Sequence, residues 1–447
     1  MYDTTAFNLT MMYGLPALTV PQEIKSNLTP WMPSPEVIEV NKDAVMWAVD
    51  GKDDRSVAFA ARLLEQNIQV RIIDKDSVLS GHNLSRGSVT VIAMDNPNSS
   101  DLHEIVNTVA TDLNMSVVSI ESGFGAKELP DWGGRHFRLL KKPQIAILSH
   151  SDFNSYDVGV SWWSLDHNLG IRHSQLNSSL TGYGDLRRYN TIILPSGSPD
   201  LSNYAKDILM DWVKQGGTLI ANNRSTRSII SNDIGSVKNL NITFDKSKNF
   251  NFDLMREIYS KEEFIDISDA NVNKVNTEIT YPWETTDITY SKEELEIRDK
   301  WQSTLMPSGG IVSARTDNEH WLTFGTEDMV PVLYGNYPIL MTGGNSEAAL
   351  RIGELIPNKE SETKTINWSQ IPSGYDLSVR MSGLVWPEAS QRIANSAYLT
   401  REKIGKGQII LFSGEPNFRG STLGTNRLWL NAVVYGSGLG TNSLVTP

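Results

Sequence analysis

The chain has 447 residues, more than one hydrophobic core usually supports, so two or three domains are expected. Hydrophobic residues make up 39% and charged residues 21%, which is typical of a globular protein and excludes a disordered one. The formal net charge of -12 argues against a nucleic-acid partner, since phosphate binding needs a basic face. No apolar run approaches the roughly 20 residues that cross a bilayer, and the first residues lack the pattern of a signal peptide.

The N-terminal third predicts an extended segment followed by a small α/β domain. Prolines punctuate residues 1–41, which favours an extended segment without regular pattern. Strand-like runs and amphipathic helices then follow in the order βαββαβ, which indicates a split βαβ domain over residues 42–125. The expected strands are 44–49, 69–73, 88–93 and 116–120, and the expected helices are 55–66 and 102–113. Residues 123–142 contain glycine and proline and are predicted to be a linker.

Residues 143–447 predict an open, mostly parallel α/β sheet of the flavodoxin-like kind. Short apolar runs alternate here with helical patterns, as in parallel strands that are joined by helical crossovers. The expected order is strand 144–149, helix 156–169, strand 191–194, helix 201–215 and strand 218–221. Ligands of such sheets bind beyond the carboxyl ends of the strands. The candidate ligand-binding residues therefore follow the predicted strands.

The remainder of the domain predicts a long insertion and then a return to the sheet. Residues 225–318 break the strand–helix rhythm, and their two expected helices, 252–259 and 292–301, look isolated. Apolar runs return at 330–334 and 338–341, and a helix is expected over 425–435. The strong strand 408–412 either joins the parallel sheet or forms an antiparallel hairpin with 397–403, because only a short glycine turn separates them.

The motifs of common hydrolases are absent from the sequence. None of the seven histidines has the short spacing of a zinc site, and no cysteine is present as a nucleophile or thiolate ligand. A Gly-x-Ser-x-Gly elbow is missing as well. Ser196 and Ser198 follow a strand, but such clusters are usually ordinary turns. No catalytic residue, metal or cofactor is therefore expected.

Eight polar or glycine residues at predicted strand ends are the candidate ligand-binding residues. They are Ser196, Gly197, Asn222, Asn223, Arg224, Glu415, Asn417 and Arg419. Arginine and backbone N–H groups favour an anionic or polar ligand, which is expected to contact Arg224 or the Ser196–Gly197 backbone. The alternative is that Arg419 and Arg427 pair with Glu415 or cap carbonyls and hold the last helix. The helical spacing of Trp162 and Trp163 predicts a core position rather than a sugar platform.

Several short segments, taken in their order along the chain, resemble the C-terminal, non-peptidase region of large bacterial zinc carboxypeptidase-like proteins. That region is similar to a class I glutamine amidotransferase-like domain. The segments that carry the resemblance are Tyr2–Leu9, Tyr13–Leu15, Arg86–Ser88, Ser155–Gly159, Gly216–Ile220, Gly405–Gly407, Pro416–Arg419 and Gly424–Arg427.

The resemblance implies a parent enzyme that trims C-terminal residues from peptides with a zinc-bound water, in a periplasmic or secreted protein. The zinc ligands would precede Tyr2, and the amidotransferase cysteine has no counterpart. The expected function is therefore a non-catalytic binding region whose partner is a carboxypeptidase-like domain or subunit, a peptide or a glycan. One alternative is a hydrolase that uses Ser196, Ser198 or Glu415. A second alternative is a carbohydrate-related binding module.

Overall fold

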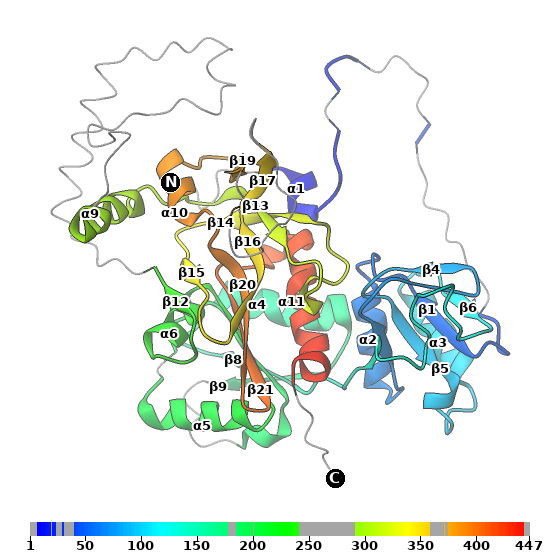
Figure 1. Ribbon diagram of the computed structural model, residues 1–447. Helices are drawn as coiled ribbons and strands as arrows, with labels where there is room; N and C mark the ends of the chain where they lie inside the picture. The colour runs from blue at the N-terminus through cyan, green and yellow to red at the C-terminus, as the bar shows by residue number, and fades with distance from the viewer. Residues whose placement is uncertain are drawn as a thin grey trace. The chain divides into compact units, whose positions relative to one another are not determined.

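The computed structural model describes residues 7–18, 20–23, 29–30, 40–177, 185–199, 201–240, 291–357, 371 and 374–441 (Figure 1). The chain forms two compact units. The larger comprises Met1–Leu240, Ser308–Leu384 and Ala394–Pro447, and the smaller comprises Asn241–Pro307 and Val385–Ile393. The predicted α/β class is confirmed. Among the helices of the described ranges, none has the length and apolarity that a bilayer crossing requires.

The first part of the larger unit is the predicted split βαβ arrangement. Its sheet has the order β6-β1-β5-β2-β7, and all neighbouring strands are antiparallel. Because β5 lies between β1 and β2, the two halves of the βαβ unit are separated, as the sequence order predicts. The elements are β1 (Met46–Val49), α2 (Ser56–Glu65), β2 (Arg71–Ile73), β5 (Val89–Ile92), α3 (Leu102–Asp112), β6 (Val118–Ile120) and β7 (Phe137–Leu139).

The segment 123–142, predicted to be a linker, instead contributes to this sheet and its core. Strand β7 pairs with β2, and Phe137 is buried in the core of this sheet with Trp132 packed against it. The glycines and prolines around these residues conceal the strand, since its apolar run is short. A hairpin that the sequence did not predict, β3 (Ser77–Leu79) and β4 (His82–Leu84), precedes β5.

One half of the main sheet is parallel and has the strand order of flavodoxin-like folds. The spatial order is β9-β8-β10-β11-β21, in which every neighbouring pair is parallel. Numbered along the chain, this order is 2-1-3-4-5. The strands are β8 (Ile145–Ser149), β9 (His173–Asn177), β10 (Thr191–Leu194), β11 (Thr218–Asn222) and β21 (Gly407–Phe412).

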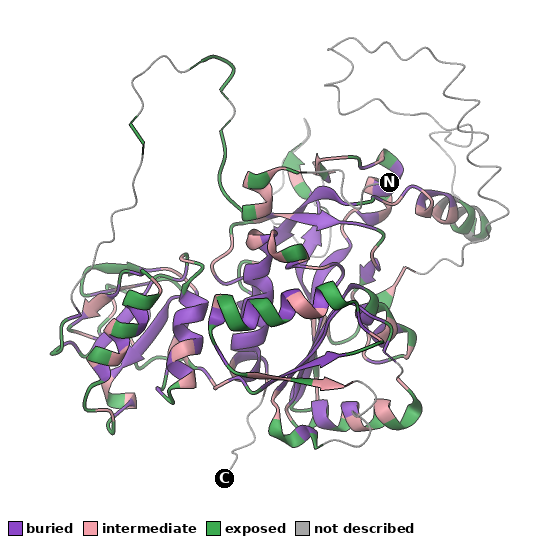
Figure 2. Ribbon diagram, turned by 180° about the vertical axis from the view of Figure 1, so that it is seen from behind, coloured by how far each residue is buried: buried purple, intermediate pink, exposed green. Residues whose placement is uncertain are grey.

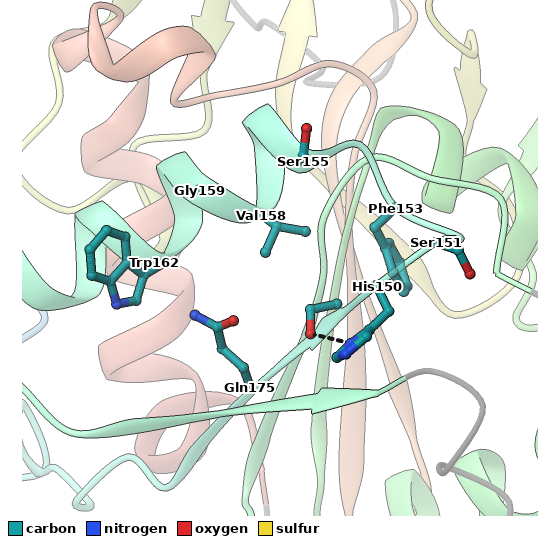
Figure 3. A pocket seen from close by; sticks show the side chains of 9 residues that line it. His150, Ser151, Phe153, Ser155, Val158, Gly159, Trp162 and Gln175 are labelled. Carbon is teal, nitrogen blue, oxygen red and sulfur yellow. Dashed lines mark hydrogen bonds between the residues drawn. The ribbon is translucent and has the colours of Figure 1, made fainter.

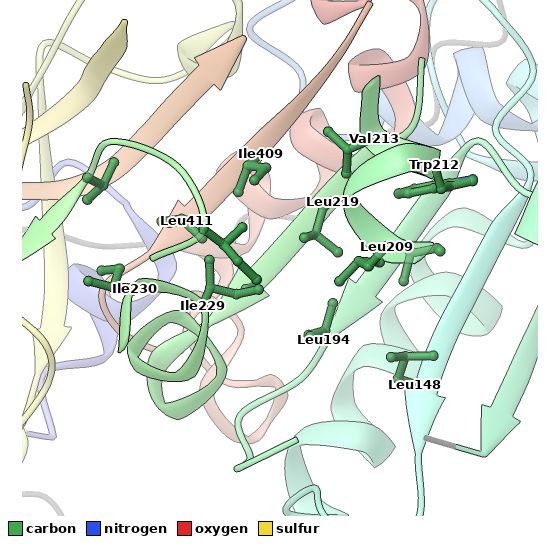
Figure 4. Packing of buried hydrophobic residues seen from close by; sticks show 14 of the residues in the cluster. Leu148, Leu194, Leu209, Trp212, Val213, Leu219, Ile229, Ile230, Ile409 and Leu411 are labelled. Atoms are coloured by element: carbon green, nitrogen blue, oxygen red, sulfur yellow. The ribbon is translucent and has the colours of Figure 1, made fainter. Parts of the chain in front are cut away.

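Apolar strand and helix faces bury the parallel half. Leu194, Leu219 and Leu411 belong to the same buried cluster as Leu209 and Trp212 of α5 (Asn203–Lys214), and Figure 4 shows Leu219 and Leu194 near Leu209. Figure 2 shows most strands of the main sheet as buried, whereas the helix Ser155–Trp163 and α5 carry exposed residues along their length. Strand β9 was not predicted, because it is an edge strand whose side chains are mostly polar and half-buried. The period-2 signal of a buried strand is therefore missing from it.

The other half of the sheet is antiparallel, so the sheet as a whole is mixed. Its strands continue from β21 in the order β20 (Ala397–Ile404), β16 (Ser346–Ile352), β13 (Gly310–Thr316) and β14 (Met329–Tyr334). Strand β21 pairs in parallel with β11 and in an antiparallel hairpin with β20. Both placements that the sequence allowed for residues 408–412 are therefore correct.

The insertion is shorter than the predicted 225–318, because sheet elements occupy both of its ends. Helix α6 (Asn223–Ser231) follows β11 directly, and β13 joins the main sheet. The expected helix 252–259 lies outside the described residues. In the smaller unit, α9 (Lys292–Ser303) confirms the second expected helix. An ion pair of 2.9 Å between Arg392 and Asp299 joins α10 (Pro387–Ile393) to α9.

The remaining elements are short, apart from two long helices of the larger unit. Helix α1 (Leu9–Tyr13) is one turn within the segment 1–41 that was expected to be extended. The two long helices are α4 (Ser155–Trp163), which continues as a π-helical turn Ser164–Leu169, and α11 (Leu423–Tyr435). The short strands are β12 (Lys238–Asn239), β15 (Leu340–Met341), β17 (Glu354–Pro357), β18 (Tyr375–Ser378) and β19 (Arg380–Ser382).

Candidate functional site

The turn from β11 into α6 has the geometry that places a functional side chain at a sheet edge. Asn223 occupies this turn with a φ of 46°, in the left-handed region that asparagine tolerates better than most residues. Enzymes that hold a serine on a strand–turn–helix elbow use a similarly sharp turn. Here the side chain is an amide, and its Nδ2 donates a hydrogen bond to Oε1 of Glu415 over 2.8 Å.

A pair of carboxyl groups, Asp157 and Glu415, lies beside this turn, and we call it the carboxyl pair. Asp157 belongs to the first turn of α4 and is 8% exposed. Burial raises the pKa of Asp157 most, and the charge and hydrogen bonding of Glu415 raise it further. The hydroxyl of Ser196 and the charge of Arg224 oppose this rise in pKa without cancelling it. The protonated form of Asp157 is therefore favoured well above the range of an ordinary aspartate.

Tyrosines pack around the carboxyl pair. Burial and the nearby charge of Glu415 raise the pKa values of Tyr337 and Tyr398 well above that of a free tyrosine. A Cβ on Gly414 would lie 2.6 Å from the ring of Tyr337, so glycine is required where the chain approaches that ring. This environment is poor in water, which strengthens each electrostatic interaction within it.

A cavity of about 540 Å³ lies at the carboxyl end of β8 and beside the middle of β9, and we call it the α4 pocket. Its lining residues are Ser149, His150, Ser151, Phe153, Ser155, Val158, Gly159, Trp162 and Gln175. Figure 3 shows Val158, Trp162 and Gln175 around the same space. No Asp, Glu, Lys or Arg is among these lining residues. The pocket therefore combines an aromatic wall with hydroxyl, amide and imidazole groups.

Backbone hydrogen bonds join the loop after β8 to the loop after β10. The amide of Asn154 donates to the carbonyl of Ser196 over 2.9 Å, and the amide of Ser198 donates to that of Asp152 over 2.8 Å. A Cβ on Gly197 would lie 2.4 Å from the Asp152 carbonyl oxygen. Gly197 thus permits this close contact, and it does not line the α4 pocket.

The structure brings four of the eight candidate residues together. Ser196, Arg224 and Glu415 interact with Asp157, although Arg224 itself is exposed, and Asn223 donates to Glu415. Of the other four, Gly197 lies between the two loops and Asn222 is buried at the end of β11. Asn417 is buried, and its Nδ2 lies 3.5 Å from Oγ of Ser164. Arg419 is exposed, and its guanidinium lies 5.0 Å from the centre of the Phe418 ring.

Arg427 has no part in this site, in agreement with the alternative that it holds the last helix. It is 2% exposed and donates hydrogen bonds to the carbonyls of Gly51 and Asp53. Its nearest acidic partner is Asp54, at 3.2 Å, and not Glu415.

Sequence reasoning missed Asp157 and misplaced Trp162. An aspartate in the first turn of a helix usually complements the helix dipole at the surface, so its pattern gives no sign of a buried pair. The predicted core positions of Trp162 and Trp163 are wrong, since these side chains are 43% and 36% exposed. Trp163 stacks on His167 with ring centres 4.7 Å apart, and Trp162 lines the pocket.

Within the described ranges, no group of three or more acidic or histidine side chains is placed to hold a metal ion. The histidines His82, His103, His136, His150, His167, His173 and His320 are all described. The structure therefore offers no multidentate centre of these side chains in those ranges.

No family model matches this sequence, and no curated protein does. Solved structures share a weak likeness with it. A β-galactosidase from Bacillus circulans sp. alkalophilus is 11% identical with a TM-score of 0.32, over 66% of this chain and 32% of the enzyme. A putative ThuA-like protein from Bacteroides uniformis is 12% identical with a TM-score of 0.30, over 65% of this chain and 89% of that protein. A cytoplasmic protein from Salmonella typhimurium is 10% identical with a TM-score of 0.29, over 65% and 97%. At these values the likenesses carry no argument about function.

Proposed function

We propose that this chain is a non-catalytic binding region that serves a zinc carboxypeptidase-like protein and holds a small neutral, polar ligand in the α4 pocket. The observation that carries the proposal is the cavity of about 540 Å³ at the carboxyl end of β8. Open α/β sheets bind their ligands at this edge. The size suits a small ligand, and pockets of this kind usually combine apolar walls with a few polar groups.

The polar groups of the pocket suit binding better than nucleophilic catalysis. The hydroxyl of Ser149 lies 3.0 Å from Nδ1 of His150 and 3.2 Å from the carbonyl oxygen of Leu176. A hydroxyl has one proton, and the carbonyl is only an acceptor. When Ser149 donates to that carbonyl, His150 must act as the donor, which is the reverse of what a general base does.

The two serines that the hydrolase alternative requires are poorly placed for nucleophilic attack. Ser198 is exposed, and the hydroxyl of Ser196 is buried and interacts with the carboxyl of Asp157. Asn223 occupies the elbow-like turn, and an amide is not a nucleophile. The arrangement therefore supports a binding role for this edge of the sheet.

The carbohydrate alternative is favoured by one specific observation, the exposed face of Trp162. An aromatic ring beside Gln175 and several serines matches a pyranose, which has one apolar C–H face and a rim of hydroxyls. The absence of Asp, Glu, Lys and Arg from the residues that line the pocket favours a neutral sugar over an anionic one. A neutral sugar is one of the polar ligands that the sequence predicted, but the predicted contacts Arg224, Ser196 and Gly197 do not line the α4 pocket.

Replacing Gly159 by leucine is expected to fill the α4 pocket and to weaken ligand binding at least about tenfold, since binding needs the lost volume. An added Cβ at Gly159 meets nothing within 4 Å, so the side chain has room to enter the cavity. The probes are neutral methyl pyranosides, with glucuronate as the anionic counterpart, and calorimetry measures their affinity.

Gly133→Leu is the matched control, because Gly133 also has open space around its Cβ but does not line the pocket. Equal affinity of the Gly159→Leu variant and the unaltered chain would rule out the α4 pocket as the binding site. Tighter binding of glucuronate than of the neutral sugars would show that the ligand class is wrong.

The purified chain is expected to release no C-terminal amino acid from blocked peptides, because a zinc-bound water needs ligands that the sequence does not supply at the usual spacing. Amino-acid analysis after incubation with zinc measures this. Release that a chelator abolishes would contradict the non-catalytic assignment.

A further inference from the structure

The two faces of α4 serve different sites. Ser155, Val158, Gly159 and Trp162 recur at the spacing of one helical face, and all four line the α4 pocket. The buried residues of the helix, Asp157, Val160 and Ser161, lie at other helical positions. A change at the carboxyl pair therefore acts on the same helix that forms the pocket wall.

The loop that carries Glu415 packs on α4 and its continuation. We call residues 414–420 the Glu415 loop. An added Cβ on Gly420 would lie 3.6–3.7 Å from Trp163 and Val160, in ordinary van der Waals contact. Nδ2 of Asn417 lies 3.5 Å from the hydroxyl of Ser164. The loop and the helix thus form a packed pair with the two carboxyl groups between them.

One oxygen of the carboxyl pair lacks a hydrogen-bond donor among the described residues. Oδ2 of Asp157 is buried and has no such partner, while Oε1 of Glu415 accepts from Asn223. An ionised carboxylate accepts hydrogen bonds only, whereas a protonated one also donates. A single proton between the two groups therefore removes the repulsion between the buried Asp157 and the half-buried Glu415, and it supplies the missing donor.

We propose that Asp157 and Glu415 share one proton at neutral pH, and that its loss loosens the Glu415 loop from α4 and makes the α4 pocket a pH-sensitive site. The effect on the pocket rests on the proposed function, whereas the shared proton does not. Two ionised carboxylates repel more strongly where burial limits screening by water, and Asp157 is buried while Glu415 is half-buried. This repulsion pushes the Glu415 loop away from α4 and so weakens the packing between them.

The groups that face Asp157 come from four other segments. Glu415 raises the pKa of Asp157 by its charge, and Ser196 and Arg224 lower it from the β10 loop and from α6. Tyr337 lies in the loop before β15, and the charge of Asp157 raises the pKa of this tyrosine. The N-terminus of α4 favours an ionised aspartate as well, yet burial outweighs all of the opposing effects.

The sign of the pH dependence follows from this direction. An unfolded aspartate ionises near pH 4, and the folded Asp157 keeps its proton to a higher pH. Between these two pKa values the folded state binds one more proton than the unfolded state. The equilibrium constant for folding therefore decreases as the pH rises, by at most about tenfold per pH unit. This stabilisation is fully present below the pKa of Asp157 in the unfolded chain. It is lost as the pH rises through the pKa of Asp157 in the folded chain.

Urea unfolding between acidic and alkaline pH tests the shared proton, with Asp157→Asn as the main variant. Asparagine has the shape of a protonated aspartate, so the variant is expected to lose that part of the pH slope and to remain folded. Glu415→Gln is expected to flatten the slope too. Asp166→Asn is the matched control, since Asp166 follows α4 closely but is exposed. An equal slope in the unaltered chain and in Asp157→Asn would overturn the proposal.

Hydrogen exchange of the α4 amides tests the link to the pocket wall. The protection of residues 155–163, corrected for the intrinsic effect of pH, is expected to fall at alkaline pH in the unaltered chain and to stay constant in Asp157→Asn. Constant protection in both would refute the loosening. Protection restored by calcium chloride in the unaltered chain alone would also overturn the proposal, because the pair would then be a cation site.

The two proposals fail separately. If no pyranose binds but the pH slope depends on Asp157, the shared proton stands and the ligand assignment fails. If a pyranose binds with the same affinity across this pH range, the pocket stands and its pH sensitivity fails.

Discussion

Replacing Arg427 by methionine is expected to reduce the free energy of unfolding by about 3–5 kcal/mol, because buried acceptors would lose their donor. Arg427 lies on α11 and donates to the carbonyl oxygens of Gly51 and Asp53 over 2.9 and 3.0 Å. It also donates to Ser56 and Asn431, each over 3.1 Å. Methionine fills part of the volume but donates to none of these atoms.

The ion pair of Arg427 contributes little to this expected loss. Its partner Asp54 has a side chain that is 63% exposed, and exposed partners are screened by water. The carbonyl of buried Gly51 loses the donor Arg427 when the guanidinium is removed, whereas the carbonyl of half-buried Asp53 still accepts from the backbone amide of Ser56. The loss should therefore persist at high salt.

Urea unfolding followed by circular dichroism measures the loss. Arg187→Met is a suitable control, since it removes an arginine that is 82% exposed and paired with Asp185. This control is expected to leave the unfolding curve unchanged. Coincident curves for Arg427→Met and the unaltered chain would show that the hydrogen bonds of Arg427 do not stabilise the fold.

Replacing Gly325 by alanine is expected to cost about 2–4 kcal/mol, through backbone strain and through a clash with the same arginine. Gly325 has a φ of 76°, which favours glycine. A Cβ there would lie 2.4 Å from Nη2 of Arg427 and 2.4 Å from the Gly51 carbonyl oxygen. The new methyl group would thus occupy the space in which that hydrogen bond forms.

Gly81→Ala separates the two causes. Gly81 has a φ of 83°, close to that of Gly325, but a Cβ there meets nothing within 4 Å. The control is expected to show the backbone strain alone, about 1 kcal/mol. An equal loss of unfolding free energy in Gly325→Ala and Gly81→Ala would show that the clash of the new methyl group with Arg427 does not destabilise the fold.

A double variant measures the coupling between the two residues. Because Gly325→Ala and Arg427→Met disturb the same hydrogen bonds, their combined loss is expected to be smaller than the sum of the two single losses. Additive losses in the urea unfolding of the four proteins would show that the two residues act independently.

The local periodicity of the sequence was enough to predict most of the regular elements. The apolar runs that became β8, β10, β11 and β21, and the amphipathic patterns that became α4 and α5, are set by backbone geometry over a few residues. The same patterns failed for β9 and β7, because one is a polar edge strand and the other is a short strand among glycines and prolines. The sequence also predicted which end of the strands carries the candidate residues, since parallel strands share one carboxyl edge.

The tertiary structure decided which of those residues meet and what each helix face contacts. Asp157 and Glu415 are far apart in the chain, and only the strand order 2-1-3-4-5 with its helices brings them together. Trp162 has the helical spacing of a core residue, yet its neighbours leave it at the wall of a cavity. Periodicity reports the conformation of a segment, whereas burial and the pKa of a carboxyl group depend on atoms that other segments supply. The sequence by itself therefore determined the elements and their edge, and only the packing of distant segments created the carboxyl pair and the α4 pocket.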